Sequence, residues 1–143
     1  MKAVTYFKIT TILSLGGVLF SGYLSAAKFL TKSCAFNECP YFLGYPACYF
    51  GFGMFLSMFA ASLFGLYAKA KSDLLVKFIL AVSAAGIIFA GNFVLAEIRL
   101  WMSAGSVNYP LVMPTCVYGL IFYIVIFILS LRQVLLAGRS KTA

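Results

Sequence analysis

Four long apolar runs, separated by short stretches that hold most of the charged residues, organise the chain. The runs extend over about Ile9 to Phe29, Ala47 to Tyr67, Leu74 to Leu100 and Leu111 to Leu136. A transmembrane helix needs about 20 apolar residues, so each run is long enough to cross a bilayer. The pattern predicts an all-α integral membrane protein, with residues 1–143 forming one four-transmembrane-helix bundle.

Composition agrees with this prediction and narrows the chemistry. The chain is 64% hydrophobic and 10% charged, and the polar residues of a soluble domain of this length could not cover so much apolar surface. The chain contains no histidine, the commonest general base and metal ligand. Its acidic residues are Glu38, Asp73 and Glu97. Paired-carboxylate catalysis and carboxylate-rich metal sites are therefore not expected.

The distribution of basic residues predicts the orientation of the helices. The N-terminus, the second connection and the C-terminus together carry Lys2, Lys8, Lys69, Lys71, Lys77, Arg132, Arg139 and Lys141, whereas the first and third connections carry Lys28, Lys32 and Arg99. Cytoplasmic loops are enriched in Lys and Arg. We therefore expect both termini to be cytoplasmic, in an inner or plasma membrane, with the first and third loops extracytoplasmic.

The net charge of +8 does not indicate a nucleic-acid partner, because the basic residues are scattered over helix ends. Contact with lipid headgroups explains them better. An N-terminal signal peptide is an alternative interpretation of residues 1–27, since Ser25-Ala26-Ala27 is similar to a cleavage site. The apolar run is long for a signal peptide, so a retained helix is the preferred interpretation.

A short motif occurs twice. Residues 46–51 and residues 114–119 both have the pattern P-x-C-x-aromatic-G, 68 positions apart, and each is followed by a long apolar run. The preceding runs also correspond, because Phe20-Ser21-Gly22 matches Phe89-Ala90-Gly91 with an offset of 69. The sequence therefore predicts two tandem helix-loop-helix repeats. Their approximate bounds are residues 9–68 and 74–137.

The motif places Cys48 and Cys116 about two residues into a helix. Proline is tolerated in the first turn of a helix, and the partial positive charge of a helix N-terminus stabilises a thiolate. Gly51 and Gly119, one turn further on, allow close helix approach. The duplicated cysteines are thus candidates for thiol chemistry.

All four cysteines are expected on the extracytoplasmic side, because Cys34 and Cys39 lie in the first loop. Four cysteines allow three pairings in an oxidising compartment. Repeat symmetry favours Cys48–Cys116, which leaves Cys34–Cys39. Both pairs are structural staples in one interpretation. In the other they form a redox relay, in which the loop pair exchanges with a soluble partner and the membrane-facing pair with a lipid quinone. A zinc site is less favoured, because four exposed thiolates would oxidise, so no metal is expected.

Further polar and aromatic residues are candidates for a binding site. Asn92 lies inside the third apolar run, where an unpartnered amide is costly, and it would bond either a neighbouring helix or a quinone carbonyl. Tyr49 and Tyr118 would border a pocket at the outer face, although an aromatic belt explains them equally well. Lys28 and Glu97 occupy equivalent repeat positions with opposite charge, which suggests a structural ion pair.

The order of these elements resembles the vitamin K epoxide reductase (VKOR) family, including its bacterial disulfide-forming homologues. The segment Leu43-Gly44-Tyr45-Pro46-Ala47-Cys48-Tyr49-Phe50-Gly51 is similar to the family's loop-to-helix segment. Cys34 and Cys39 take the place of its loop cysteine pair, and Met113-Pro114-Thr115-Cys116 the place of its CxxC motif. The resemblance implies a four-helix bundle around a quinone pocket, a CxxC that exchanges with the quinone, and a loop pair that oxidises a thioredoxin-like partner.

This chain departs from the family pattern at two positions. Met113 stands where the first CxxC cysteine is expected, and Ala47 near the place of a polar quinone-contacting asparagine. The resemblance is therefore to a divergent bacterial or archaeal homologue that lacks the CxxC motif. We expect Cys48 to replace the missing cysteine from a neighbouring helix, giving a membrane thiol–disulfide oxidoreductase with Cys34, Cys39, Cys48 and Cys116 as catalytic residues. The alternative is a non-catalytic four-helix membrane protein with structural disulfides, such as an assembly partner.

Overall fold

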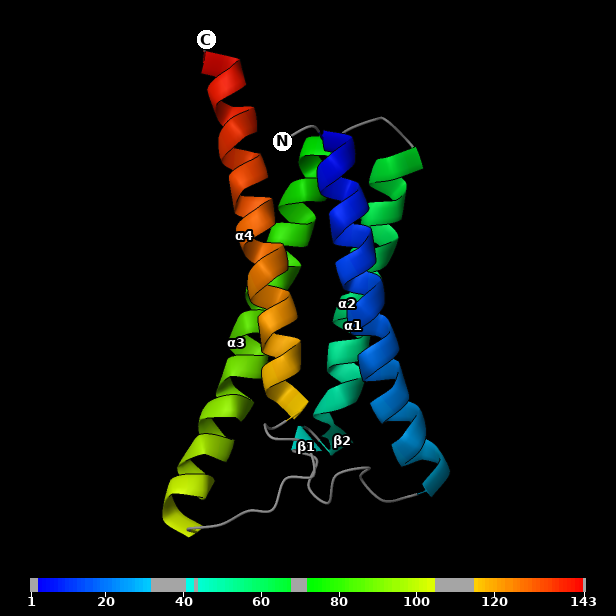
Figure 1. Cartoon of the computed structure of the whole chain (residues 1–143), viewed down its shortest axis with the longest axis vertical. Coiled ribbons are helices and arrows are strands. Elements are labelled where there is room, and N and C mark those ends of the chain that lie inside the picture. Colours follow the sequence, from blue (N-terminus) through cyan, green and yellow to red (C-terminus); the bar gives the residue numbers. More distant parts are fainter. Residues whose placement is uncertain (1–2, 32–40, 43, 68–71, 105–114, 143) are drawn as a thin grey trace.

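The computed structural model describes residues 3–31, 41–42, 44–67, 72–104 and 115–142. These residues form four helices and one short hairpin (Figure 1). The helices are α1 (Ala3–Thr31), α2 (Ala47–Tyr67), α3 (Ser72–Ala104) and α4 (Thr115–Thr142). The strands are β1 (Tyr41–Phe42) and β2 (Tyr45–Pro46).

Each helix contains a segment that is long and apolar enough to span a membrane. The segments are Ala3–Ala26, Ala47–Tyr67, Asp73–Ala96 and Cys116–Arg139. The prediction of an all-helical, multi-pass membrane protein is confirmed at this level. The helices are longer than most of the apolar runs because residues beyond the runs, such as Lys8 before the first and Arg139 after the fourth, continue the helix.

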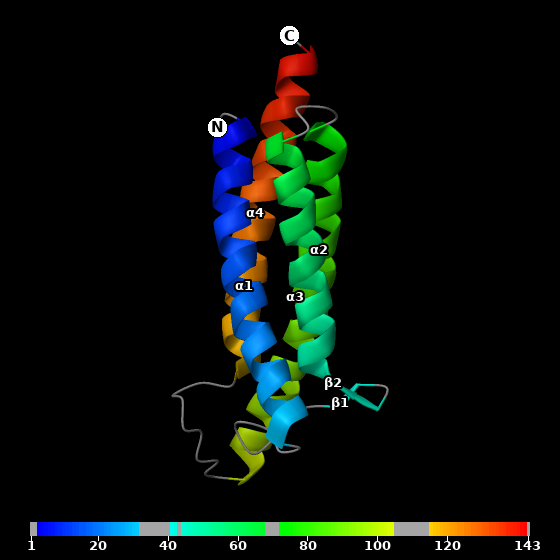
Figure 2. The same cartoon turned by 90° about the vertical axis from the view of Figure 1, so that its right-hand side faces the viewer.

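The helices form an elongated bundle of two adjoining hairpin-like pairs. Helix α1 packs mainly on α2 and α3 mainly on α4, while smaller α2–α3 and α1–α4 interfaces join the two pairs (Figure 2). The N-terminal end of α1 and the C-terminal end of α4 lie at the same end of the bundle, opposite the hairpin (Figure 1). We call these the terminal end and the hairpin end.

The β-hairpin directly before α2 was not expected from the sequence. Its strands are antiparallel, with Tyr41 opposite Pro46 and Phe42 opposite Tyr45. Gly44 in the turn has a φ of 83°, a conformation that glycine adopts without steric cost. Because β2 runs straight into Ala47, the hairpin determines where α2 begins.

Aromatic rings packed on glycines bring the helices of each pair close together. Phe7 of α1 packs over Gly65 of α2, and Phe55 of α2 packs over Gly17 of α1. In the other pair, Tyr123 of α4 packs over Gly86 of α3. A methyl group added at Gly17, Gly65 or Gly86 would overlap the facing ring, so these positions require glycine for packing.

Hydroxyl groups link the helices near the terminal end. The Tyr6 hydroxyl lies 2.7 Å from Ser130 Oγ, which itself donates to the Ile126 carbonyl, so Tyr6 is the donor. Thr11 Oγ1 donates to Ser62 Oγ at 2.9 Å. We call Tyr6, Thr11, Ser62 and Ser130 the hydroxyl layer. Hydrogen bonds between transmembrane helices stabilise a bundle modestly but fix its register.

Buried positions recur along the chain with the offsets seen in the sequence. Six of the eight residues that are buried on α1 are matched by residues buried on α3, each 69 positions further on; Tyr6 and Leu24 are the exceptions. The matches are Phe7 and Val76, Thr10 and Ile79, Ser14 and Ser83, Gly17 and Gly86, Ser21 and Ala90, and Ser25 and Val94. On α2 and α4 the buried matches are Phe55 and Tyr123, Met58 and Ile126, and Ser62 and Ser130, each 68 positions apart.

Candidate functional site

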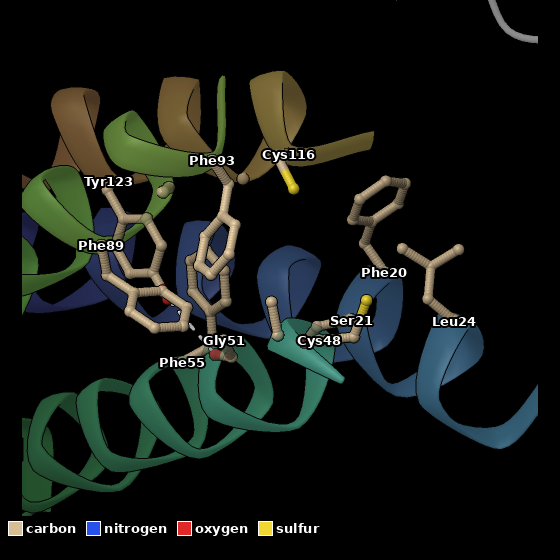
Figure 3. Close-up of a pocket in the computed structure, with 13 residues that line it drawn as sticks. Phe20, Ser21, Leu24, Cys48, Gly51, Phe55, Phe89, Phe93, Cys116 and Tyr123 are labelled. Carbon is tan, nitrogen blue, oxygen red and sulfur yellow. Dashed lines mark hydrogen bonds between the residues drawn. The ribbon is translucent and has the colours of Figure 1, made fainter. Parts of the chain in front are cut away.

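A cavity of about 60 Å³ lies among the four helices in the hairpin half of the bundle (Figure 3). Its described lining is almost entirely apolar. Most of the lining residues form pairs that are 68 or 69 positions apart. These pairs are Phe20 and Phe89, Ser21 and Ala90, Leu24 and Phe93, Cys48 and Cys116, Gly51 and Gly119, and Phe55 and Tyr123, with Ala47 as an additional lining residue.

Two cysteine thiols enter this cavity from different helices. Cys48 is the second residue of α2 and Cys116 is the second residue of α4. Both are half-buried, and Figure 3 shows their sulfur atoms directed into the space between the helices. Cys48 and Cys116 thus lie at the starts of two helices beside one cavity, whereas the equivalence of these helices and a disulfide between the cysteines stay predictions.

Phe55 and Tyr123 form the floor of the cavity. Their rings stack with centroids 4.3 Å apart and an angle of 11° between the planes. Each residue lies seven positions after the cysteine of its own helix, which places the cysteine and the ring on one helix face. We call this stacked pair the aromatic floor. Helices α2 and α4 therefore present the same order of groups to the cavity: thiol, glycine and aromatic ring.

The described lining contains two hydroxyl groups. Ser21 Oγ donates to the Gly17 carbonyl at 2.6 Å, a short bond within α1. The Tyr123 hydroxyl donates to the Gly51 carbonyl across the bundle at 3.3 Å, a distance beyond the usual range for O–H···O bonds. The cavity thus combines two thiols, one strongly bonded hydroxyl and one weakly bonded hydroxyl within aromatic walls.

The lining suits a hydrophobic ring in chemistry but is tight in size. Aromatic and aliphatic side chains with a few polar groups are typical of small-molecule pockets. A cavity of about 150 Å³ in another protein binds benzene, and the present cavity of about 60 Å³ is smaller. Entry of a quinone ring therefore requires lining side chains to move outward.

The two tyrosines predicted to border the pocket lie beside the cavity rather than in its described lining. Tyr118 contacts one lining residue, since its ring centroid is 5.9 Å from that of Phe20. Tyr49 is 37% exposed. Their role in binding a cofactor stays a prediction.

Asn92 faces a different space. Its Nδ2 donates to the Ile88 carbonyl one turn back on α3, at 2.7 Å, which reduces the cost of an amide in an apolar helix. Asn92 lines a separate open groove between α2 and α3, together with Met54, Ala85, Ile88, Phe89 and Phe93. Phe89 and Phe93 line both the groove and the cavity, so they form the wall between the two spaces.

Some predicted residues lie outside the described part of the structure. Cys34 and Cys39 fall in residues 32–40, and Met113 falls in residues 105–114. The side chains of Lys28 and Glu97 are likewise outside it. The Cys34–Cys39 pair and the Lys28–Glu97 ion pair therefore stay predictions.

The aromatic floor was not identified from the sequence, although a signal for it was present. Phe55 and Tyr123 are 68 positions apart, the same offset as the cysteines, and each follows its cysteine by two helical turns. Extending the comparison of the two segments past the P-x-C-x-aromatic-G motif would have found both residues.

No protein-family model, curated protein or solved structure matches this chain.

Proposed function

We propose that this protein is a membrane thiol–disulfide oxidoreductase that passes electrons between extracytoplasmic thiols and a lipid quinone. The observation that carries the proposal is the meeting of Cys48 and Cys116, from two helix starts, at one apolar cavity. The partial positive charge at each helix N-terminus favours thiolate formation. Reactive thiols beside an apolar pocket suit exchange between a protein dithiol and a membrane-soluble acceptor.

The proposed reaction moves one electron pair at a time. A dithiol of a thioredoxin-like partner reduces the Cys34–Cys39 disulfide and becomes a disulfide itself. The resulting loop thiols then reduce a Cys48–Cys116 disulfide by thiol–disulfide exchange. Reoxidation of Cys48 and Cys116 releases two electrons and two protons, which a quinone bound at the cavity would accept to become a hydroquinone.

Two tandem repeats, with both termini cytoplasmic, form part of the same proposal. The recurrence of burial at offsets of 68 and 69 supports a duplicated unit. The location of the two chain ends at one end of the bundle agrees with an even number of spans (Figure 1). The excess of basic residues at that end favours a cytoplasmic location for it. The cysteines would then face an oxidising compartment.

A relationship to the VKOR family is proposed on sequence resemblance and on this arrangement of thiols. In the proposal, Cys48 takes the part of the cysteine that Met113 replaces. The redox-active pair therefore joins two helices instead of lying within one CxxC segment. Asn92, Tyr49 and Tyr118 keep their proposed role as contacts of the quinone.

A second candidate is a non-catalytic membrane protein, for instance an assembly partner, in which the cysteine pairs act as structural staples. The small cavity volume of about 60 Å³ favours it, because a quinone does not enter without movement of side chains. The two candidates differ in whether the cysteines change oxidation state under mild conditions.

Oxidation of the membrane-bound protein by a quinone tests the proposal. The full chain is reduced with dithiothreitol, freed of reductant and exposed to 2,3-dimethyl-1,4-naphthoquinone, and its thiols are counted by mass-tag alkylation on a gel. We expect the wild type to lose thiols in pairs within minutes, and Cys48→Ser and Cys116→Ser each to lose this quinone-dependent step. A Cys34→Ser/Cys39→Ser variant serves as the matched control and should keep it.

The same experiment decides between the two candidates. The oxidoreductase proposal would be contradicted if the quinone did not change the number of thiols in the wild type. It would also be contradicted if Cys48→Ser were oxidised by the quinone as fast as the wild type. Disulfides that resist mild reductant unless the protein is denatured would favour structural staples.

A further inference from the structure

The two residues of the aromatic floor differ by one hydroxyl group. The lining positions 55 and 123 correspond, but one ring is a phenyl and the other a phenol, so only Tyr123 carries a hydroxyl there. Both rings are equally buried, at 2% exposed, and they stack on each other. The difference therefore adds a polar group without changing the packing of the rings.

The Tyr123 hydroxyl is the lining hydroxyl that is available to a ligand. Ser21 donates its proton in a 2.6 Å bond within α1, whereas Tyr123 donates across 3.3 Å to the Gly51 carbonyl. That carbonyl lies inside α2, where the helical pattern already supplies an N–H partner. Turning the Tyr123 proton toward a ligand thus leaves no buried carbonyl without a hydrogen bond.

The Tyr123 hydroxyl is well placed to donate a hydrogen bond to a ring ligand that lies between the cysteines and the aromatic floor. Gly51 and Tyr123 both line the cavity, and Figure 3 shows the Tyr123 ring on the floor, with Cys48 and Cys116 further toward the hairpin end. A ring between the thiols and the floor would have one edge near the sulfur atoms and another near the hydroxyl.

We propose that the Tyr123 hydroxyl is a specificity-determining group, which donates a hydrogen bond to a carbonyl oxygen of the ring ligand and thereby favours a quinone over a hydrocarbon ring of the same shape. The inference rests on the proposed function, because it assigns the polar contact within the same quinone site. It differs from the sequence-based candidates, since Tyr123 lies two turns deeper than Cys116.

The test compares two ligands of the same shape in the full chain. The Cys48→Ser/Cys116→Ser background prevents electron transfer, and binding in detergent is measured from the rise of the unfolding midpoint with ligand concentration. The ligands are 2,3-dimethyl-1,4-naphthoquinone and 2,3-dimethylnaphthalene, which lacks the carbonyl oxygens. We expect Tyr123→Phe to weaken the apparent quinone affinity by about two- to tenfold and to leave the hydrocarbon affinity unchanged.

Exchange of the two floor residues gives the decisive control. The Phe55→Tyr/Tyr123→Phe variant moves the hydroxyl to the corresponding position on α2, and we expect it to recover most of the quinone affinity. Equal weakening of both ligands by Tyr123→Phe, or no weakening of the quinone, overturns the inference while leaving the proposed function standing. If the protein that keeps Phe55 and Tyr123 does not bind the quinone, both the inference and the proposed function are overturned.

Discussion

At the terminal end of the bundle hydroxyl groups join the helices, whereas at the hairpin end aromatic rings and thiols surround a cavity. In the first region Tyr6 reaches Ser130 from α1 to α4, and Thr11 reaches Ser62 from α1 to α2. In the second region a long hydrogen bond of 3.3 Å runs from the Tyr123 hydroxyl to the Gly51 carbonyl. The same four helices thus form a hydrogen-bonded region at the terminal end and a region with a cavity at the hairpin end.

The comparison teaches that stability and binding are separated along the bundle axis. Lipid tails are as apolar as the helix faces, so packing and hydrogen bonds hold transmembrane helices together. Side chains around a cavity lose packing contacts, which lowers the free energy of unfolding. In this protein that loss lies at the hairpin end. We expect substitutions at the two ends to affect different properties, and the following predictions test this, from the largest expected change in the free energy of unfolding to the smallest.

Gly65→Ala should destabilise the bundle most, because its new methyl group would overlap the Phe7 ring at the terminal end. Overpacking of this kind costs about 1–3 kcal/mol. Gly53→Ala on the same helix is the matched control, since nothing lies within 4 Å of a methyl group there. Unfolding of both variants in mixed detergent micelles measures the difference. Equal stability of the two variants would show that the Phe7–Gly65 contact is loose.

Tyr6→Phe should have a smaller effect, because it removes one hydrogen bond of the hydroxyl layer and keeps the ring. Double-mutant cycles in another membrane protein put such bonds at about 0.6 kcal/mol on average. A cycle of Tyr6→Phe with Ser130→Ala isolates the pair from its surroundings. Ser57→Ala is the control, since Ser57 donates within its own helix. A coupling of zero would mean that the terminal end is held by packing alone.

Gly119→Ala should change stability least while slowing the reaction with quinone, because Gly119 lines the cavity and nothing lies within 4 Å of an added methyl group. We expect the free energy of unfolding to change by about 0.5 kcal/mol or less, and quinone-dependent loss of thiols to become slower because the methyl group narrows a small cavity. Gly91→Ala has similar free space outside the cavity lining and should keep the wild-type rate. An unchanged rate in Gly119→Ala would argue against the cavity as the quinone site.

The fold was largely predictable, because bilayer thickness and apolar run length determine where helices form. The second run, Ala47 to Tyr67, agrees with α2 residue for residue, since a tight hairpin precedes it. The hairpin itself was missed, because two-residue strands have too few positions to show an alternating pattern. The location of Cys48 and Cys116 at one cavity could be anticipated from the recurring P-x-C-x-aromatic-G motif, whereas the groove beside Asn92 could not, because it depends on how α2 and α3 cross.

The unequal pair at the aromatic floor depends on both rings belonging to one polypeptide. Had two copies of a shorter chain met at this point, a single codon would have set both rings, and the interface would have carried two phenyl groups or two phenols. Covalent linkage of the halves lets Phe55 and Tyr123 change separately. A hydroxyl on one ring of such a stacked pair and not on the other is thus possible in a single chain, whereas a symmetric homodimer would carry it on both rings or on neither.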